Sequence, residues 1–246
     1  MNQQKINVPT GDEYIIREQT GADDDLLSKL DVDEATVLNR YIAAIIISGP
    51  NEKRLTLKDV EELLLRDKYI ILFKSRIFSL SDKLIFSYNW PEQDEPIEYE
   101  VDLKDYVWDY SKPFPKLGDE DYCSDMIPPY DNKEKEVTFT LTSGKVVSFG
   151  LLDGVGEKYL LGVKPMERSI NKQLVARAFK VDDGSKMVTV KNFQVFSSRD
   201  MMEIRNKVDI VDPPVEGNTT IVNPADGASA DLPIIGIKDF YYPVKI

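Results

Sequence analysis

Alternating hydrophobic and polar residues mark several short stretches of the chain. The clearest are Ile85–Tyr88 and Ile97–Leu103, and we also predict a strand at Glu13–Arg17 and a strand pair around Val137–Leu151. Successive side chains of a strand point to opposite faces, so this period predicts strands with one buried face. The short spacing between neighbouring strands indicates antiparallel pairs in both halves of the chain.

A helical spacing of hydrophobic residues marks four other stretches. They are Ala35–Ile47, Lys68–Phe78, Ser169–Phe179 and Phe193–Ile210. The first ends at Ser48-Gly49-Pro50, a strong stop signal. With the strands, these helices predict an α+β fold in which each half has a small antiparallel sheet and two to three helices.

The same pattern occurs twice at a constant offset of 133 residues. Thr10-Gly11 recurs as Ser143-Gly144, and Arg66-Asp67 recurs as Arg199-Asp200. Chance supplies single matches but not a series of them in one register. The chain therefore predicts two similar tandem domains rather than a short-period solenoid.

The predicted domains span residues 1–107 and 137–246. Residues 108–136 between them are rich in proline and acidic residues and predict an extended linker. A second stretch with many Pro, Asp and Gly residues, Asp212–Ala230, predicts a long loop before a final strand at Leu232–Tyr242.

Composition excludes several kinds of active site. The 246 residues include no histidine and one cysteine, Cys123. Ser-His-Asp and Cys-His catalytic arrangements are therefore absent, and no Cys/His zinc site is possible. We interpret Cys123 as incidental, because it lacks a histidine to activate it.

Charge and hydropathy argue against nucleic-acid and membrane partners. The net charge is −12, and no Lys/Arg cluster is dense enough to form a basic face for phosphates. The N-terminal residues lack the apolar region of a signal peptide, and the longest apolar stretch, Ile42–Ile47, is too short to span a bilayer.

The repeated Arg-Asp pairs, Arg66-Asp67 and Arg199-Asp200, allow two interpretations. A pair of opposite charges is suited to catalysis or to clamping a ligand. Both pairs stand at a predicted helix–helix junction, however, where an aspartate caps a helix and an arginine forms an ion pair. We interpret them as structural helix corners, with Asp67 capping the helix Lys68–Phe78.

Other acidic and glycine-containing motifs lack essential residues. Asp23-Asp24-Asp25 has neither the alternating spacing nor the glycine of a calcium loop and suits a helix start. Ser143-Gly144-Lys145 lacks the upstream glycine and the Ser/Thr of a P-loop. We interpret the acidic residues of the linker as a solvated charge run.

Several short elements together point to a known family. They are Pro9-Thr10-Gly11, Arg17, Thr20-Gly21 and Asp24, then Asp67, Leu72 and Arg76, then Val101-Asp102-Leu103 and finally Tyr241-Tyr242-Pro243. In this order they resemble the baseplate hub subunit and assembly proteins of T-even-type contractile-tail phages. The resemblance covers most of the chain.

One departure from the family bears on metal binding. Many members carry Cys-Pro-x-Cys after the second helix, whereas this chain has Trp90-Pro91-Glu92-Gln93 and Asn223-Pro224-Ala225-Asp226. The prolines remain and the thiols are replaced, so a zinc site is not carried over. Packing of Trp90 is a hypothetical replacement for it in the first repeat.

The resemblance implies a non-enzymatic tail or baseplate protein that acts in hub assembly, as a chaperone does, or remains as a structural subunit. It implies hub or tape-measure-associated proteins as partners, in the virion or in the host cytoplasm during assembly. The expected contact residues are aromatic and lie among prolines or near the C-terminal end: Tyr110, Phe114, Tyr122, Tyr130, Tyr241 and Tyr242. The alternative is a small enzyme or ligand-binding protein that uses carboxylates and a divalent metal.

The composition generates a direct prediction about metal content. Purified protein is expected to contain no stoichiometric zinc, and a chelator is expected to leave its melting temperature unchanged. Elemental analysis and thermal unfolding measure these two quantities. Roughly one zinc per chain would contradict the prediction.

Overall fold

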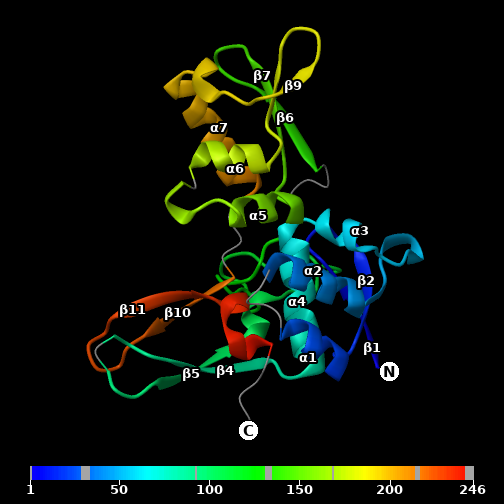
Figure 1. Cartoon of the computed structure of the whole chain (residues 1–246), viewed down its shortest axis with the longest axis vertical. Coiled ribbons are helices and arrows are strands. Elements are labelled where there is room, and N and C mark those ends of the chain that lie inside the picture. Colours follow the sequence, from blue (N-terminus) through cyan, green and yellow to red (C-terminus); the bar gives the residue numbers. More distant parts are fainter. Residues whose placement is uncertain are drawn as a thin grey trace. The chain divides into compact units, whose positions relative to one another are not determined.

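The computed structural model of the chain describes residues 2–28, 34–91, 93–130, 135–167, 169–213 and 217–241 (Figure 1). The chain divides into two compact units. The first contains Met1–Thr56, Arg66–Pro129 and Val215–Ile246, and the second contains Leu57–Leu65 and Tyr130–Pro214. Both units combine helices with small antiparallel sheets, so the predicted α+β class is confirmed.

The first unit begins with a three-stranded antiparallel sheet. Its strands, in the order β1-β2-β3, are β1 (Gln3–Asn7), β2 (Glu13–Arg17) and β3 (Ile46–Ser48). Ile6 pairs with Tyr14 in the register, and both side chains are buried, as is Ile16 two residues further on. Ile46 and Ile47, which we predicted as the end of the helix Ala35–Ile47, belong to β3 instead. The β-branched isoleucines favour this extended conformation.

Helices of the first unit cover this sheet and form its core. They are α1 (Gly21–Leu27), α2 (Glu34–Ile45) and α4 (Leu65–Ser79). Most side chains of α4 between Arg66 and Arg76 are buried, so the helix is covered on most of its sides. The ring of Phe73 is stacked on Tyr106 and meets Phe240 edge to face, with 5.6 Å between ring centroids in each pair.

Two hairpins complete the first unit. One is β4 (Lys83–Tyr88) with β5 (Ile97–Asp102), and the other is β10 (Asn218–Val222) with β11 (Ser229–Pro233). The hydroxyl of Tyr99 donates to Val222 O (3.1 Å) and that of Tyr106 donates to Asn218 O (3.2 Å). The predicted long loop Asp212–Ala230 is therefore wrong in part, because a hairpin occupies much of it.

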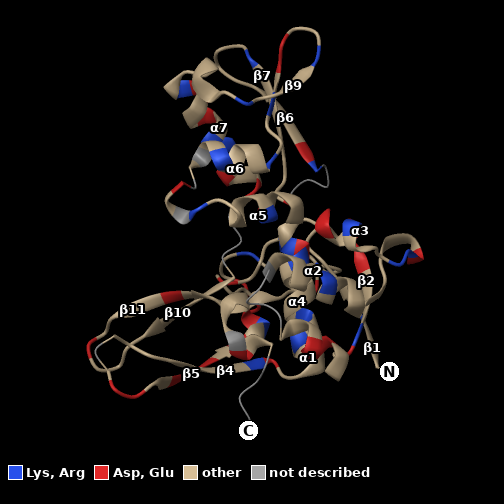
Figure 2. Ribbon diagram, in the orientation of Figure 1, with Lys and Arg blue, Asp and Glu red and all other residues tan. Residues whose placement is uncertain are grey.

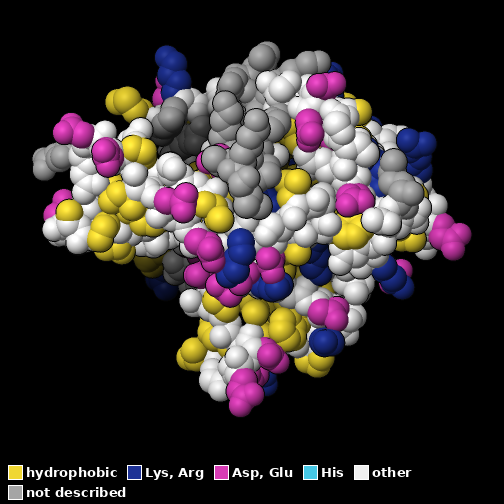
Figure 3. Space-filling view, turned by 90° about the horizontal axis from the view of Figure 1, so that it is seen from below, with side chains coloured by type: hydrophobic (Ala, Val, Ile, Leu, Met, Phe, Trp, Pro, Cys, Tyr) yellow, Lys and Arg dark blue, Asp and Glu magenta, His cyan; other side chains and the backbone are white. Residues whose placement is uncertain are grey.

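The exposed face of the first hairpin carries paired charges. Lys83 forms ion pairs with Glu100 (3.3 Å) and Asp102 (2.9 Å), and Lys104 pairs with Asp82. Figure 3 shows acidic and basic side chains side by side near the centre of this view, and hydrophobic side chains toward the left, where the hairpins extend in Figure 1. Lys83 and Lys104 thus have carboxylate partners within the chain.

The second unit is built on a four-stranded antiparallel sheet. Its strands, in the order β6-β7-β8-β9, are β6 (Glu136–Thr140), β7 (Val146–Gly150), β8 (Lys180–Asp182) and β9 (Met187–Thr189). The helices are α3 (Leu57–Glu61), α5 (Gly154–Leu161), α6 (Ile170–Ala176) and α7 (Ser198–Val211). Phe149, Phe179, Phe196 and Ile204 are central members of its hydrophobic core.

A buried ion pair joins α6 to α7 in the second unit. Arg177 Nη2 lies 3.0 Å from Asp212 Oδ2, and both side chains are almost inaccessible. The same carboxylate oxygen accepts a hydrogen bond from Leu152 N (2.9 Å). Removing either charged partner would leave the other buried without its counter-charge.

Short 3₁₀ helices connect the elements. They are η1 (Pro50–Glu52), η2 (Leu103–Tyr106), η3 (Pro165–Glu167), η4 (Phe193–Val195), η5 (Ile234–Gly236) and η6 (Lys238–Phe240). Within the described residues, every helix is too short or too polar to span a bilayer.

The order of elements supports the predicted repeat without proving it. β6, β7, α5 and α7 begin 133 residues after β1, β2, α1 and α4, respectively. The division into units nevertheless differs from the predicted domains 1–107, 108–136 and 137–246. Residues 215–246 belong to the first unit, because their hairpin and Phe240 pack there. The duplication stays a prediction, which superposition of the two halves tests.

This packing predicts that residue 240 stabilises the first unit from a distance in sequence. Phe240→Ala is expected to destabilise that unit by about 3–5 kcal/mol, because it opens a cavity beside Phe73. Urea unfolding followed by probes in each unit measures the effect. Val222→Ala, at an exposed site, is the control and is expected to change stability little. An equal loss of stability in both variants would contradict the prediction.

Candidate functional site

Asp67 and Asp200 each form hydrogen bonds between the start of a helix and the turn of a hairpin. Asp67 is the third residue of α4, and its carboxylate accepts hydrogen bonds from Thr10 N (3.1 Å) and Thr10 Oγ1 (2.8 Å). Asp200 is the third residue of α7 and is hydrogen-bonded to Ser143. Thr10 and Ser143 lie in corresponding turns, between β1 and β2 and between β6 and β7.

The prediction that Asp67 caps the helix Lys68–Phe78 is wrong, because α4 begins at Leu65 and Asp67 lies within its first turn. Asp200 instead takes part in a capping box with Ser197, in which each backbone N–H donates to the other side chain. Hydrogen bonds from Ser143 and Ser197 lower the pKa of Asp200 to about 2.

The two arginines have different surroundings. Arg66 is buried and its Nη1 donates to Pro129 O (3.0 Å) and more distantly to Pro128 O (3.4 Å). The side chain of Arg199 is exposed, and its Nε lies 3.6 Å from Glu203. The aspartates of the two Arg-Asp pairs therefore have the same role, whereas the arginines do not.

The predicted linker folds onto the first unit as far as Pro129. Ile127 is buried, its N–H donates to Tyr106 O (3.1 Å), and its carbonyl accepts a hydrogen bond from the hydroxyl of Tyr110 (2.7 Å). The prediction of an extended linker is therefore wrong for this part. Hydrophobic contacts and the Arg66 hydrogen bonds hold it against the unit.

Most of the aromatic contact candidates pack on their own unit. Phe114 lies edge to face with Trp108, at 6.5 Å between centroids, and Tyr122 is half-buried. Tyr130 is buried with Leu64 and Leu151 in the second unit. Tyr241 is buried against Phe240, and Tyr242 lies outside the described residues.

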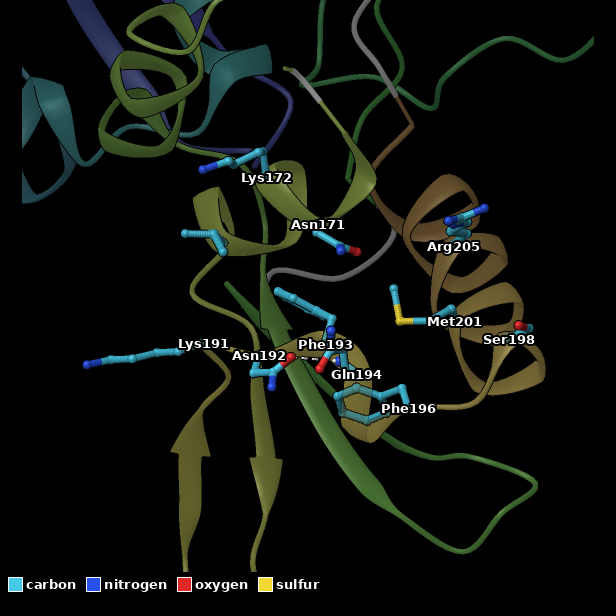
Figure 4. A pocket seen from close by; sticks show the side chains of 11 residues that line it. Asn171, Lys172, Lys191, Asn192, Phe193, Gln194, Phe196, Ser198, Met201 and Arg205 are labelled. Atoms are coloured by element: carbon cyan, nitrogen blue, oxygen red, sulfur yellow. Dashed lines mark hydrogen bonds between the residues drawn. The ribbon is translucent and has the colours of Figure 1, made fainter. Parts of the chain in front are cut away.

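An open pocket of about 620 Å³ lies in the second unit between α6, η4 and α7 (Figure 4). We call it the α6–α7 pocket. Its lining residues are Asn171, Lys172, Val175, Lys191, Asn192, Phe193, Gln194, Phe196, Ser198, Met201 and Arg205. Asn171 on α6 and Met201 on α7 point toward one another across it.

The inner part of the pocket continues into the hydrophobic core. Phe196 belongs to that core, and Phe193 and Met201 pack against it. The ring of Phe179 holds Phe193 and Phe196 at centroid distances of 5.8 and 5.7 Å. Aromatic packing therefore supports the apolar side chains at the centre.

The rim of the pocket is basic. Lys172, Lys191 and Arg205 stand at its edge, and none forms an ion pair with another described residue. Figure 4 shows Lys191 and Arg205 extending outward, and Figure 2 shows basic residues on α6 and α7. The described lining contains no carboxylate, in a chain whose net charge is −12.

Three positions of the pocket lining correspond to buried positions in the first unit. Asn171, Val175 and Arg205 correspond, at the offset of 133, to three buried side chains. These are Leu38, Ile42 and Leu72. In addition, α6 has 7 residues where α2 has 12. The pocket was not predicted from the sequence, although the change from leucine to a polar residue at Asn171 and Arg205 is a signal that could have indicated it.

A second cavity, of about 450 Å³, lies in the first unit beside α4. Of its three lysines, Lys5 pairs with Glu13 and Lys104 pairs with Asp82. Lys74 donates to Asn7 O (3.1 Å) and lies over the ring of Tyr110. Burial lowers the pKa of Lys74 to about 8. All three lysines of this cavity thus have partners within the chain.

Among the described residues, no three His, Cys, Asp or Glu side chains form a group that could hold a metal ion. Asp23 instead forms an ion pair with Arg17 at 2.6 Å. At three of the positions where the sequence comparison above set Cys-Pro-x-Cys against this chain, Trp90 Nε1 donates to the Tyr99 hydroxyl (2.8 Å) and Gln93 Nε2 donates to Asn223 Oδ1 (3.0 Å). Hydrogen bonds thus join the two hairpin ends directly.

No known protein family, curated protein or solved structure matches the chain.

The turn contact of Asp67 generates a prediction about stability. Asp67→Ala is expected to lower the free energy of unfolding by about 1–3 kcal/mol, because the half-buried Thr10 loses the acceptor of its N–H and of its hydroxyl. Asp67→Ser is expected to be destabilising as well, since its shorter side chain does not reach the turn. Urea unfolding measures both, with exposed Asp94→Ala as control. An Asp67→Ser variant as stable as wild type would contradict the role of this contact.

The lowered pKa of Lys74 predicts a pH effect. Between about pH 8 and the ordinary lysine pKa of 10.5, the unfolded chain binds a proton at Lys74 that the folded chain has lost. This group therefore adds stability as pH rises through that window. Relative to wild type, Lys74→Met is expected to be most stable near pH 7 and to lose that advantage toward pH 10.5. Unfolding at several pH values measures it, with Lys116→Met, at an exposed lysine, as the control.

Proposed function

We propose that the chain is a non-enzymatic phage tail or baseplate protein that works through contacts with other tail proteins. It acts in assembly of the baseplate hub or as a structural subunit of the baseplate. Two kinds of support carry this proposal. One is the resemblance of its repeated elements to T-even-type hub and assembly proteins, and the other is the α6–α7 pocket.

The pocket has the composition of a protein-contact site. An apolar centre surrounded by polar and charged groups is the usual arrangement where proteins meet. Phe193, Phe196 and Met201 supply the centre, and Lys172, Lys191 and Arg205 supply the rim. A basic rim favours a partner segment that combines an apolar side chain with carboxylates.

The same pocket is poorly suited to the alternative enzyme. Carboxylate-based hydrolysis and divalent-metal catalysis both need several acidic side chains around one cavity. The described lining of the α6–α7 pocket has none. The observation in the structure that supports the proposal is therefore the α6–α7 pocket, in which aromatic side chains at the centre are bordered by Lys172, Lys191 and Arg205.

The test is complementation in the phage that encodes the chain. Its gene is deleted, and cells supply wild type, Lys191→Glu with Arg205→Glu, or the control Lys164→Glu with Lys186→Glu. The control changes the net charge equally at exposed sites outside the described pocket lining. Electron microscopy counts complete tails, and circular dichroism verifies folding.

We expect the pocket variant to stall tail assembly by at least about tenfold, because charge reversal at a rim opposes an acidic partner. The control is expected to assemble normally. A folded pocket variant that gives normal tails would count against the pocket, and normal tails without the gene would count against the proposed function.

A further inference from the structure

The most exposed part of the predicted linker is a turn in the first unit. Residues 116–122, which we call the Leu117 turn, present the side chain of Leu117 to solvent with 87% of its surface exposed. Asp119 N donates to Lys116 O (3.0 Å), and Asp119 Oδ2 accepts from Lys116 N (2.8 Å). Gly118 has a φ of +101°, which suits glycine at this bend.

Acidic side chains follow Leu117 directly. Glu120 and Asp121 are exposed, and neither forms an ion pair with another described residue. The turn is further closed by a hydrogen bond from Tyr122 N to Asp119 O (3.1 Å). An apolar side chain and two free carboxylates are thus held on an ordered backbone, so little conformational entropy is lost when the turn binds.

The Leu117 turn and the α6–α7 pocket are complementary. The turn offers an apolar side chain flanked by negative charges. The pocket offers an apolar centre with Lys172, Lys191 and Arg205 on its rim. Its volume of about 620 Å³ is in the range of cavities that enclose small ligands, so it has room for a leucine and adjacent backbone.

We propose that the Leu117 turn of one copy of this chain docks in the α6–α7 pocket of a second copy. The inference rests on the proposed use of this pocket for protein contacts. Because the contact joins two different surfaces, each copy keeps a free turn or a free pocket for another. Repetition of such a contact forms a closed ring or an open filament, not only a dimer.

The size and charge of the contact define its expected behaviour. A single turn in one pocket buries less surface than a standard stable interface, so the association is expected to depend on protein concentration. Exposed charges contribute to it, and salt therefore weakens it. Analytical ultracentrifugation of the full chain at several concentrations and at low and high salt measures both properties.

Three matched double variants locate the contact. The pocket variant is Lys191→Glu with Arg205→Glu, the turn variant is Glu120→Lys with Asp121→Lys, and the control is Lys164→Glu with Lys186→Glu. Leu117→Ser tests the apolar contact, and Met166→Ser, at a fully exposed methionine, is its control. Asp119 is left unchanged because its carboxylate holds the turn.

Pocket variant, turn variant and Leu117→Ser are each expected to weaken self-association at least about tenfold, while both controls behave as wild type. A mixture of pocket variant and turn variant is expected to associate again, because the unchanged turn of the first fits the unchanged pocket of the second and the reversed charges also face each other. Wild type that stays monomeric at every concentration, or pocket and turn variants that associate like wild type, would overturn the proposal.

The complementation assay separates this proposal from the proposed function. If wild type is monomeric but the folded pocket variant still stalls tail assembly, the second copy is the wrong occupant and another tail protein takes the pocket. If self-association follows the turn and the pocket but all variants give normal tails, the docking is supported and the pocket-based argument for function fails.

Discussion

The first unit depends on packing around the ring of Phe73. Tyr106 stacks on this ring and Phe240 meets it edge to face, both at 5.6 Å between centroids. The backbone of Gly217 also approaches it, since a Cβ at that glycine would lie 3.5 Å from the ring. Phe73, in the middle of α4, is thus covered by residues from both sides of Tyr130–Pro214 in the sequence. Tyr106 precedes that stretch, and Gly217 and Phe240 follow it. Because they share one core, these separated stretches form a single folding unit.

The elements that were predicted from sequence are those with strong local patterns. β4 and β5 alternate apolar and polar residues, and α7 follows a helical period, so each was recognisable alone. β10 was missed, and the final strand was wrongly predicted at Leu232–Tyr242, where the structure has the end of β11 and then η5 and η6. Asn218–Val222 and Ser229–Pro233 are short and mostly polar or small, so their local pattern is weak. Their pairing gains from the hydroxyls of Tyr99 and Tyr106, which come from far away in the chain. The unit boundaries depend on the same distant contacts, and no local pattern encodes them.

The candidate site was harder to predict than the fold. Val175, Phe193 and Met201 are apolar residues in or next to helices, where such residues usually face a core. Whether they line a core or an opening depends on how far the neighbouring helix extends, and α6 is shorter than α2. For the Arg-Asp pairs, the sequence correctly marked the two aspartates as related positions, but the role predicted for Asp67 was wrong. Asp67 accepts a hydrogen bond from Thr10, which lies 57 residues away in the sequence. A prediction that considers only the residues next to Asp67 does not detect this contact.

The interrupted first unit has a consequence for how the chain folds during synthesis. A ribosome delivers residues in order, at roughly 5–20 per second. The second unit has all of its residues once Pro214 has been made, whereas the first still lacks the β10–β11 hairpin and Phe240. The second unit is thus able to reach its native state while the ring of Phe73 still lacks part of its cover. For that interval the nascent chain exposes apolar surface on its N-terminal part, which is the condition in which chaperone binding and misassembly occur.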